Sequence, residues 1–188
     1  TENDITFLSS GKYNRESSKT KALVCITSQK LSMNLPSKCS KIIVKDVLLA
    51  VTKVSKLFYR KADTDYPDTR LINSSQLKDK YRGVSFGINV LVGENVKLGE
   101  DSFIGSNSII ESSVEIGKNC VVGSYVNIKN TLIEDHVHIQ DGSKIGIKGF
   151  GFIPSQTNNI RTPHIGRVIL KNNVHIGAGC TIARGSLS

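Results

Sequence analysis

The segment FGINVLVGENVKLGEDSFIGSNSIIESSVEIGKNCVVGSYVNI, residues 86–128, places an apolar residue at every sixth position. The eight repeating residues are Phe86, Val92, Leu98, Ile104, Ile110, Ile116, Val122 and Ile128. A spacing of six fits neither an amphipathic helix nor a single long strand, whose side chains alternate. It is typical of a coil in which each six-residue side carries a short strand and a corner, with three sides to a turn.

A second set of small or aliphatic residues follows the first by four positions, and we expect it to share the interior of the coil. Its members are Val90, Val96, Ser102, Ser108, Val114, Cys120, Val126 and Leu132. Glycine follows the first-set residue six times, as at Gly87 and Gly105. Because glycine tolerates conformations and close backbone contacts that other residues do not, it suits a corner. We predict a parallel β-helix; a β-sandwich with accidental spacing is the alternative.

The period slips by one residue after Ile128 and is lost between residues 147 and 164. That stretch, IKGFGFIPSQTNNIRTPH, is rich in glycine, proline and asparagine, which favour loops. The period resumes at Leu170 and continues through Ile176, with Cys180 at a second-set position. We therefore predict a loop inserted at 147–164, and a loop that leaves a regular solenoid usually marks a functional face.

The sequence before the coil predicts a small α/β domain. Residues 4–8, 22–26 and 42–44 have the composition of strands. Asp46 is a suitable N-cap for a helix over 47–58, which carries an apolar stripe at helical spacing. The fold class is thus α+β, with an α/β domain at 1–62, a linker at 63–82 and the β-helix, with its inserted loop, at 83–188.

The positive charge lies mainly before the coil. Residues 1–82 contain sixteen Lys and Arg against eight Asp and Glu, a balance of +8, whereas residues 83–188 contribute only +1. This favours an anionic partner such as a phosphate-bearing ligand or an acidic protein. Nucleic acid is the competing interpretation, but no basic helix, zinc-finger spacing or RNP-like aromatic motif supports it, and we expect no nucleic-acid partner.

The four cysteines form no close pair in the sequence, which indicates a reducing cytoplasm, and no transmembrane segment is expected. The histidines are His136, His138, His164 and His175. A zinc site needs several converging ligands, and only His136 and His138 are close in the sequence. We predict four solvated histidine side chains, no metal site and no cofactor.

Several motifs together resemble the UDP-3-O-acylglucosamine N-acyltransferases of lipid A biosynthesis. They are DITFLSSGKY at 4–13, TKAL at 20–23, VLLAVTKVSKLF at 47–58, the hexapeptides, IGIKGFGF at 145–152, and the later HIGRVIL and TIARG. The resemblance implies a left-handed β-helix and a homotrimer. It also implies transfer of a 3-hydroxyacyl chain from acyl carrier protein to the 2-amino group of UDP-3-O-acylglucosamine.

The resemblance also implies two sites. Phe7, Ser10 and Tyr13 match the positions that hold the uracil of the substrate, and packing of the two rings into the domain is the alternative role. Gly149, Phe150, Gly151 and Phe152 match a loop near the groove for the acyl chain; the aromatic residues would otherwise serve to anchor the loop.

The histidine that serves the family as general base matches no position here, so we predict no catalytic residue. We expect this chain to be an incomplete part of the enzyme, truncated at Ser188 and inactive by itself. Ser10, Lys148 and Ala183 differ from the residues usual in the family. The alternative is a truncated, non-catalytic β-helix protein that at most binds a UDP sugar. A weaker alternative is another hexapeptide acyltransferase that uses acyl-CoA.

Overall fold

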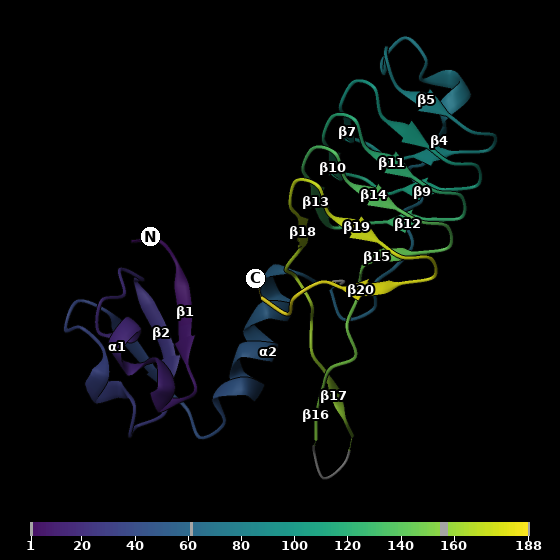
Figure 1. Cartoon of the computed structure of the whole chain (residues 1–188). Coiled ribbons are helices and arrows are strands. Elements are labelled where there is room, and N and C mark those ends of the chain that lie inside the picture. The colour runs from purple at the N-terminus through teal and green to yellow at the C-terminus, as the bar shows by residue number, and fades with distance from the viewer. Residues whose placement is uncertain (1, 61, 155–157, 188) are drawn as a thin grey trace. The chain divides into compact units, whose positions relative to one another are not determined.

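The computed structural model describes residues 2–60, 62–154 and 158–187, which form two compact units (Figure 1). The first unit comprises Thr1–Asp63 with Gly151–Pro163, and the second comprises Thr64–Phe150 with His164–Ser188. All described helices lack the length and apolarity that crossing a bilayer requires.

The first unit contains a small parallel sheet with strand order β1-β2-β3. Its elements are β1 (Ile5–Leu8), η1 (Gly11–Tyr13), α1 (Asn14–Ser17), β2 (Val24–Thr27), η2 (Ser32–Asn34), β3 (Ser40–Ile43) and α2 (Val47–Phe58), together with the antiparallel pair β16 (Phe152–Ile153) and β17 (Ile160–Arg161). Leu8, Cys25, Leu35 and Cys39 form its buried core. Helix α2 begins where the Asp46 carboxylate accepts a hydrogen bond from Leu49 N at 2.9 Å, which is the expected N-cap.

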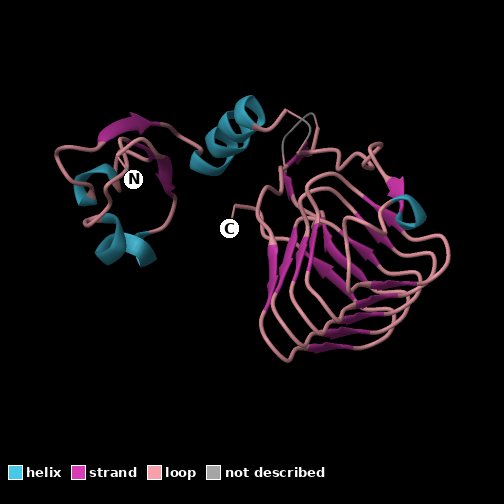
Figure 2. Ribbon diagram, turned by 90° about the horizontal axis from the view of Figure 1, so that it is seen from above, coloured by secondary structure: helices cyan, strands magenta, loops and turns pink. Residues whose placement is uncertain are grey.

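The second unit is a coil whose two- to four-residue strands enter three parallel sheets in turn (Figure 2). One sheet has the order β18-β13-β10-β7, from Val168–Leu170, Thr131–Ile133, Glu115–Ile116 and Lys97–Leu98. The second has the order β19-β14-β11-β8-β5, from His175–Ile176, His138–Ile139, Val121–Val122, Phe103–Ile104 and Ser85–Phe86. The third has the order β20-β15-β12-β9-β6, from Thr181–Ala183, Lys144–Ile147, Asn127–Ile128, Ile109–Ile110 and Leu91–Val92, with β4 (Ile72–Asn73) antiparallel at its edge before η3 (Ser74–Gln76).

This arrangement fits a β-helix of the hexapeptide type, and its handedness stays a prediction. The first-set residues fill the core, since Val92, Ile104, Ile110 and Ile128 are fully buried. The inward serines satisfy polar groups between coils. Ser102 Oγ, for example, donates to Gly117 O at 2.9 Å and accepts from Cys120 N at 3.0 Å.

The glycines of the repeat are needed because successive coils touch at the corners. A Cβ on Gly105 would overlap backbone atoms of Gly123, one coil further on. None of these glycines has a positive φ; that conformation falls instead on the corner residues that follow, mostly Asn or Asp, such as Asn107 at φ 58° and Asn119 at φ 54°. Asn and Asp tolerate this left-handed region better than other residues with a side chain.

Three sequence-based assignments differ from the structure. Leu132 points outward rather than inward, because the corner after Ile128 is one residue shorter. Cys180 is exposed rather than buried, and it lies between β19 and β20. His164 is buried, at 7% exposure, rather than solvated.

The segments expected as linker and loop contain ordered structure. Within 63–82, Tyr81 is 6% exposed and its hydroxyl donates to Val96 O at 2.9 Å, so this stretch packs on the coil. Within 147–164, strands β16 and β17 pair as Phe152 with Arg161 and Ile153 with Ile160. Residues 155–157 of this predicted loop lie outside the described residues.

Gly105→Ala should destabilise the coil, because the added methyl group would overlap the backbone of Gly123. Overpacking of this kind costs about 1–3 kcal/mol, which a shift in the denaturant midpoint would measure. Gly177→Ala is the matched control. Gly177 has the same place in its hexapeptide, yet its Cβ would lie 3.8 Å from Cys180 Sγ, an ordinary contact. Equal losses in the two variants would contradict the packing explanation.

Candidate functional site

The predicted uracil residues lie at the surface of the first unit. Phe7, in β1, is 36% exposed, and Tyr13, the last residue of η1, is 61% exposed. Neither ring belongs to the buried core, where Leu8 takes the inward place beside Phe7. Ser10 caps η1, and its Oγ accepts from Lys12 N at 3.3 Å. Both rings therefore have faces open to a ligand.

The predicted acyl-groove segment divides between the two units. Gly149 packs against the buried imidazole of His164, because a Cβ there would lie 2.8 Å from Nε2. The side chain of Phe150 is 92% exposed. Gly151 and Phe152 belong to the first unit, where the Arg161 guanidinium lies 5.8 Å from the Phe152 ring centroid.

The segment 147–164 leaves the coil and returns to it, and we call it the excursion. Arg184, a residue not predicted as functional, binds the chain at both ends of the excursion, within the second unit. Its side chain is 5% exposed, and it donates from Nη1 to Gly146 O at 3.0 Å and from Nε to His164 O at 2.8 Å. A third donor, Nη2, pairs with Asp65 Oδ1 at 3.0 Å. The only signal in the sequence was the place of Arg184 in the TIARG motif.

The Asp65–Arg184 pair belongs to a row of four charges at one end of the third sheet. Lys129 Nζ lies 3.5 Å from Asp65 Oδ2 and 3.2 Å from Glu111 Oε1. Two carboxylates and two cations balance, so the row serves to hold the chain rather than to attract a charged ligand. Asp65 Oδ2 also accepts from Lys148 N at 3.3 Å, which places the start of the GFGF segment.

The pKa values of the two carboxyl groups in the row are shifted in opposite directions. Burial alone would raise the pKa of Asp65, but the hydrogen bond and charge of Arg184, with Lys129, hold the pKa below its usual value. Burial raises the pKa of Glu111, and the attraction of Lys129 only partly offsets it. Asp65 is therefore the fixed anion to which Arg184 and Lys129 both pair.

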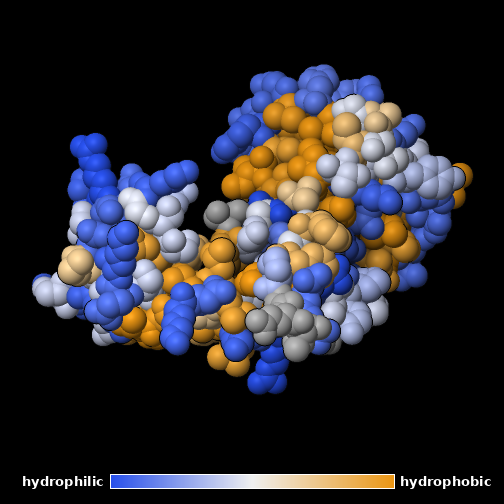
Figure 3. Space-filling model, turned by 90° about the horizontal axis from the view of Figure 1, so that it is seen from below, coloured by the Kyte–Doolittle hydropathy of each residue, from blue (hydrophilic) through white to orange (hydrophobic). Residues whose placement is uncertain are grey.

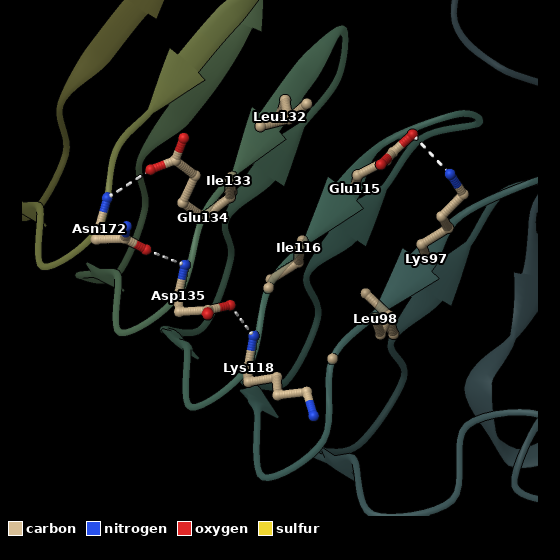
Figure 4. Close-up of a pocket in the computed structure, with 12 residues that line it drawn as sticks. Lys97, Leu98, Glu115, Ile116, Lys118, Leu132, Ile133, Glu134, Asp135 and Asn172 are labelled. Atoms are coloured by element: carbon tan, nitrogen blue, oxygen red, sulfur yellow. Dashed lines mark hydrogen bonds and ion pairs between the residues drawn. The ribbon is translucent and has the colours of Figure 1, made fainter.

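A shallow groove of about 610 Å³ runs along a corner of the coil, beside the first sheet (Figure 4). Its lining combines aliphatic residues with charged ones: Lys97, Leu98, Gly99, Glu115, Ile116, Gly117, Lys118, Leu132, Ile133, Glu134, Asp135 and Asn172. The polar groups pair with one another. Asn172 N donates to Glu134 Oε2 at 3.1 Å, and Lys118 N donates to Asp135 Oδ1 at 2.8 Å. The repeat pattern does not reveal this groove, because it assigns the outward Leu132 to the interior.

Within residues 2–60, 62–154 and 158–187, nowhere do three or more His, Cys, Asp or Glu side chains gather in a way that suits a metal ion. The cysteines are all free thiols.

Comparisons with known proteins bear on both units. Residues 1–57 match the family described as UDP-3-O-(3-hydroxymyristoyl) glucosamine N-acyltransferase, and residues 95–130 match the bacterial transferase hexapeptide. UDP-3-O-acylglucosamine N-acyltransferase 1 of Francisella tularensis subsp. holarctica (strain OSU18) is 35% identical over 192 residues, which cover 96% of this chain. This chain is homologous to the UDP-3-O-acylglucosamine N-acyltransferases.

The homology to these acyltransferases covers part of each relative. The chain spans 54% of the length of the Francisella protein. The N-acyltransferase of Rhodopseudomonas palustris (strain BisB5) is 44% identical over 70 residues, 37% of this chain and 19% of that protein. A solved N-acyltransferase from Bacillus cereus, AntD in complex with dTDP and coenzyme A, has 24% identity over 62% of this chain and 72% of its own, with a TM-score of 0.31.

Asp68→Asn should weaken the coil most near neutral pH. Burial would raise the pKa of Asp68, but hydrogen bonds from Ser112 and Arg70 N lower it to about 2. A lowered carboxyl pKa stabilises the fold above the unfolded value, about 3.9, and this stabilisation is lost as the pH falls toward 2. The shift corresponds to about 2 kcal/mol at pH 7, since the side chain is only 10% exposed.

Denaturant midpoints of wild type and Asp68→Asn at several pH values would measure this difference. We expect the difference in the free energy of unfolding between the two proteins to be largest above pH ~4 and to decrease below it. Asp79→Asn, which removes an exposed aspartate of the same unit, is the control and should change stability by less than about 0.5 kcal/mol. A gap that stays constant with pH would rule out the electrostatic explanation.

Proposed function

We propose that this protein acts in the transfer of a 3-hydroxyacyl chain from acyl carrier protein to the 2-amino group of UDP-3-O-acylglucosamine, a step in lipid A biosynthesis. The observation that carries the proposal is the 35% identity to a named N-acyltransferase across 96% of the chain, which takes in both units. The separate family matches support it, because the match at 1–57 names this N-acyltransferase and the match at 95–130 names the hexapeptide of bacterial transferases.

In this proposal the first unit, together with the basic residues around it, binds the UDP group. Phe7 and Tyr13 would stack on the uracil, and Ser10 would contact its polar edge. The exposed faces of both rings support this role, since a ring that is already packed in the core offers no stacking surface. The balance of +8 over residues 1–82 favours the diphosphate.

Phe7→Ala and Tyr13→Ala should each weaken binding of UDP. Stacking of a base on an aromatic ring is worth about 1–3 kcal/mol, so we expect the dissociation constant to rise about 5- to 150-fold. Isothermal titration calorimetry with UDP measures the change. Tyr59→Ala, which removes an exposed ring elsewhere in the same unit, should leave the affinity unchanged. An equal loss in Tyr59→Ala, or none in the two test variants, would refute the uracil site.

The segment Gly149, Phe150, Gly151 and Phe152 is proposed to lie along the acyl chain. The exposure of Phe150 supports this, because so open an aromatic side chain has most of its apolar surface available to a ligand. Arg184 would act as a positioning residue here, since it binds Gly146 O and His164 O at the two ends of the excursion.

The proposed reaction forms one bond and breaks another. The sugar nitrogen bonds to the thioester carbonyl carbon, the carbon–sulfur bond breaks, and the carrier leaves as a thiol. A general base must take the proton that the nitrogen loses, and donors must stabilise the carbonyl oxygen as it becomes negative. We assign neither role to a residue of this chain. His164, the one buried histidine among the described residues, supplies its carbonyl to Arg184.

Two further properties belong to the same proposal. The protein would work as a homotrimer, which sedimentation would test. It would also act in the cytoplasm, because four free thiols suit a reducing compartment.

The rival proposal is a protein that binds a UDP sugar without catalysis. Lys148 and Ala183, which differ from the residues usual in the family, favour it, and they lie at the ends of neighbouring strands in which Ile147 pairs with Ala183. Thiol release from 3-hydroxyacyl carrier protein by the native gene product, dependent on UDP-3-O-acylglucosamine, is expected of the transferase. Acceptor binding without thiol release would support the binder, and release only from acyl-CoA would support a different hexapeptide transferase.

A further inference from the structure

Two histidines far apart in the sequence meet on the outer face of the coil. His138 is in β14 and His175 is in β19, and the two strands pair in parallel with these residues directly in register. Both side chains are exposed, while their neighbours Val137 and Ile139 point into the core. The pairing of β14 with β19 therefore holds the two imidazoles side by side.

The geometry of the two rings suits a shared metal ion. Their centroids lie 5.5 Å apart and their planes are inclined at 60°. An ion about 2.0–2.1 Å from one nitrogen of each ring, with a tetrahedral angle between the bonds, places the centroids roughly 5 Å apart. Small side-chain rotations, which exposed rings make readily, are enough to close the remaining difference.

We infer that His138 and His175 form a binding site for a late first-row divalent metal ion, such as Zn²⁺, Ni²⁺ or Cu²⁺. Imidazole is a favoured ligand for these ions, and Cu²⁺ should bind most tightly of the three. The protein supplies two ligands, so water completes the coordination. The bound ion would connect adjacent coils and leave positions open to a further ligand.

The experiment titrates the tag-free full chain with NiSO₄ and with ZnSO₄ by isothermal titration calorimetry. We expect one ion per chain, and we expect His138→Asn and His175→Asn each to weaken binding roughly tenfold or more, because either change breaks the chelate. His136→Asn is the matched control. It removes a neighbouring histidine at φ 58°, where asparagine is tolerated, and should leave the affinity unchanged.

A gain of affinity provides an independent test. Val121 lies in β11, in register with His138 on the next strand, and is 38% exposed. Val121→His would continue the row with a third imidazole and should tighten Ni²⁺ binding by roughly tenfold or more. Cu²⁺ bound to wild type should show nitrogen coordination by electron paramagnetic resonance, and His138→Asn should lose it.

Several outcomes would overturn the site. If wild type binds the metal ion no more tightly than His138→Asn does, the two rings are in contact but do not form a metal site. A loss in His136→Asn as large as in His175→Asn would indicate non-specific binding. Cys180 carries an exposed thiol, so binding lost in Cys180→Ser but kept in His138→Asn would assign the ion to sulfur. Circular dichroism of each variant shows whether the coil is intact.

Discussion

The close stacking of successive coils is the constraint on which the second unit depends. Adjacent coils touch through backbone atoms at the glycine corners, as the packing of Gly105 on Gly123 shows. This contact brings the aliphatic residues of each level close to those above and below, where they form one buried core, and it holds the strands in register. The buried serines extend the same principle, because Ser108 Oγ donates to Gly123 O at 2.8 Å and accepts from Val126 N at 3.0 Å across one coil.

The row of four charges at the end of the third sheet binds the irregular segments around Asp65 and Lys148 to the regular coil. Glu111, Lys129 and Arg184 each follow a strand of the third sheet, so the coil brings them to one end of that sheet. Asp65 joins them from the segment before the first coil. Removing a single partner would leave buried charge unpaired, which costs far more than the loss of an exposed pair such as Lys97 and Glu115. The start of the GFGF segment is thus placed by electrostatics as much as by backbone geometry.

The sequence predicted the parts of the structure that depend on local period. Residues such as Ile104 and Val122 are inward because a repeat of six dictates it, and α2 follows its apolar stripe from the Asp46 cap. Features that depend on pairing between distant residues were not predictable in this way. The excursion at 147–164 lies between His138 and His175 and lengthens the sequence between them beyond one regular coil. The repeat alone therefore does not predict that the two histidines pair. The outward turn of Leu132 depended on where the shortened corner fell.

For the candidate uracil and acyl-groove residues, too, some features follow from the sequence and others only from the structure. Resemblance selected Phe7, Tyr13 and Phe150, and the structure adds that all three rings are exposed. Apolar side chains reach the surface of both units on the face shown in Figure 3. Arg184 was missed as a positioning residue because its partners, Gly146 O and His164 O, are backbone atoms that carry no signal in the sequence.

The pairing of Asp65 with Arg184 also bears on how the protein forms during synthesis. Most contacts of the coil join residues about 18 positions apart, as Asn89 and Asn107 do, so each level can stack as soon as the ribosome releases it. Asp65 and Arg184 are 119 positions apart. The segment around Asp65 can therefore pair with Lys129 as soon as that residue has been made, but its contact with Arg184 forms only after the intervening coils have been synthesised.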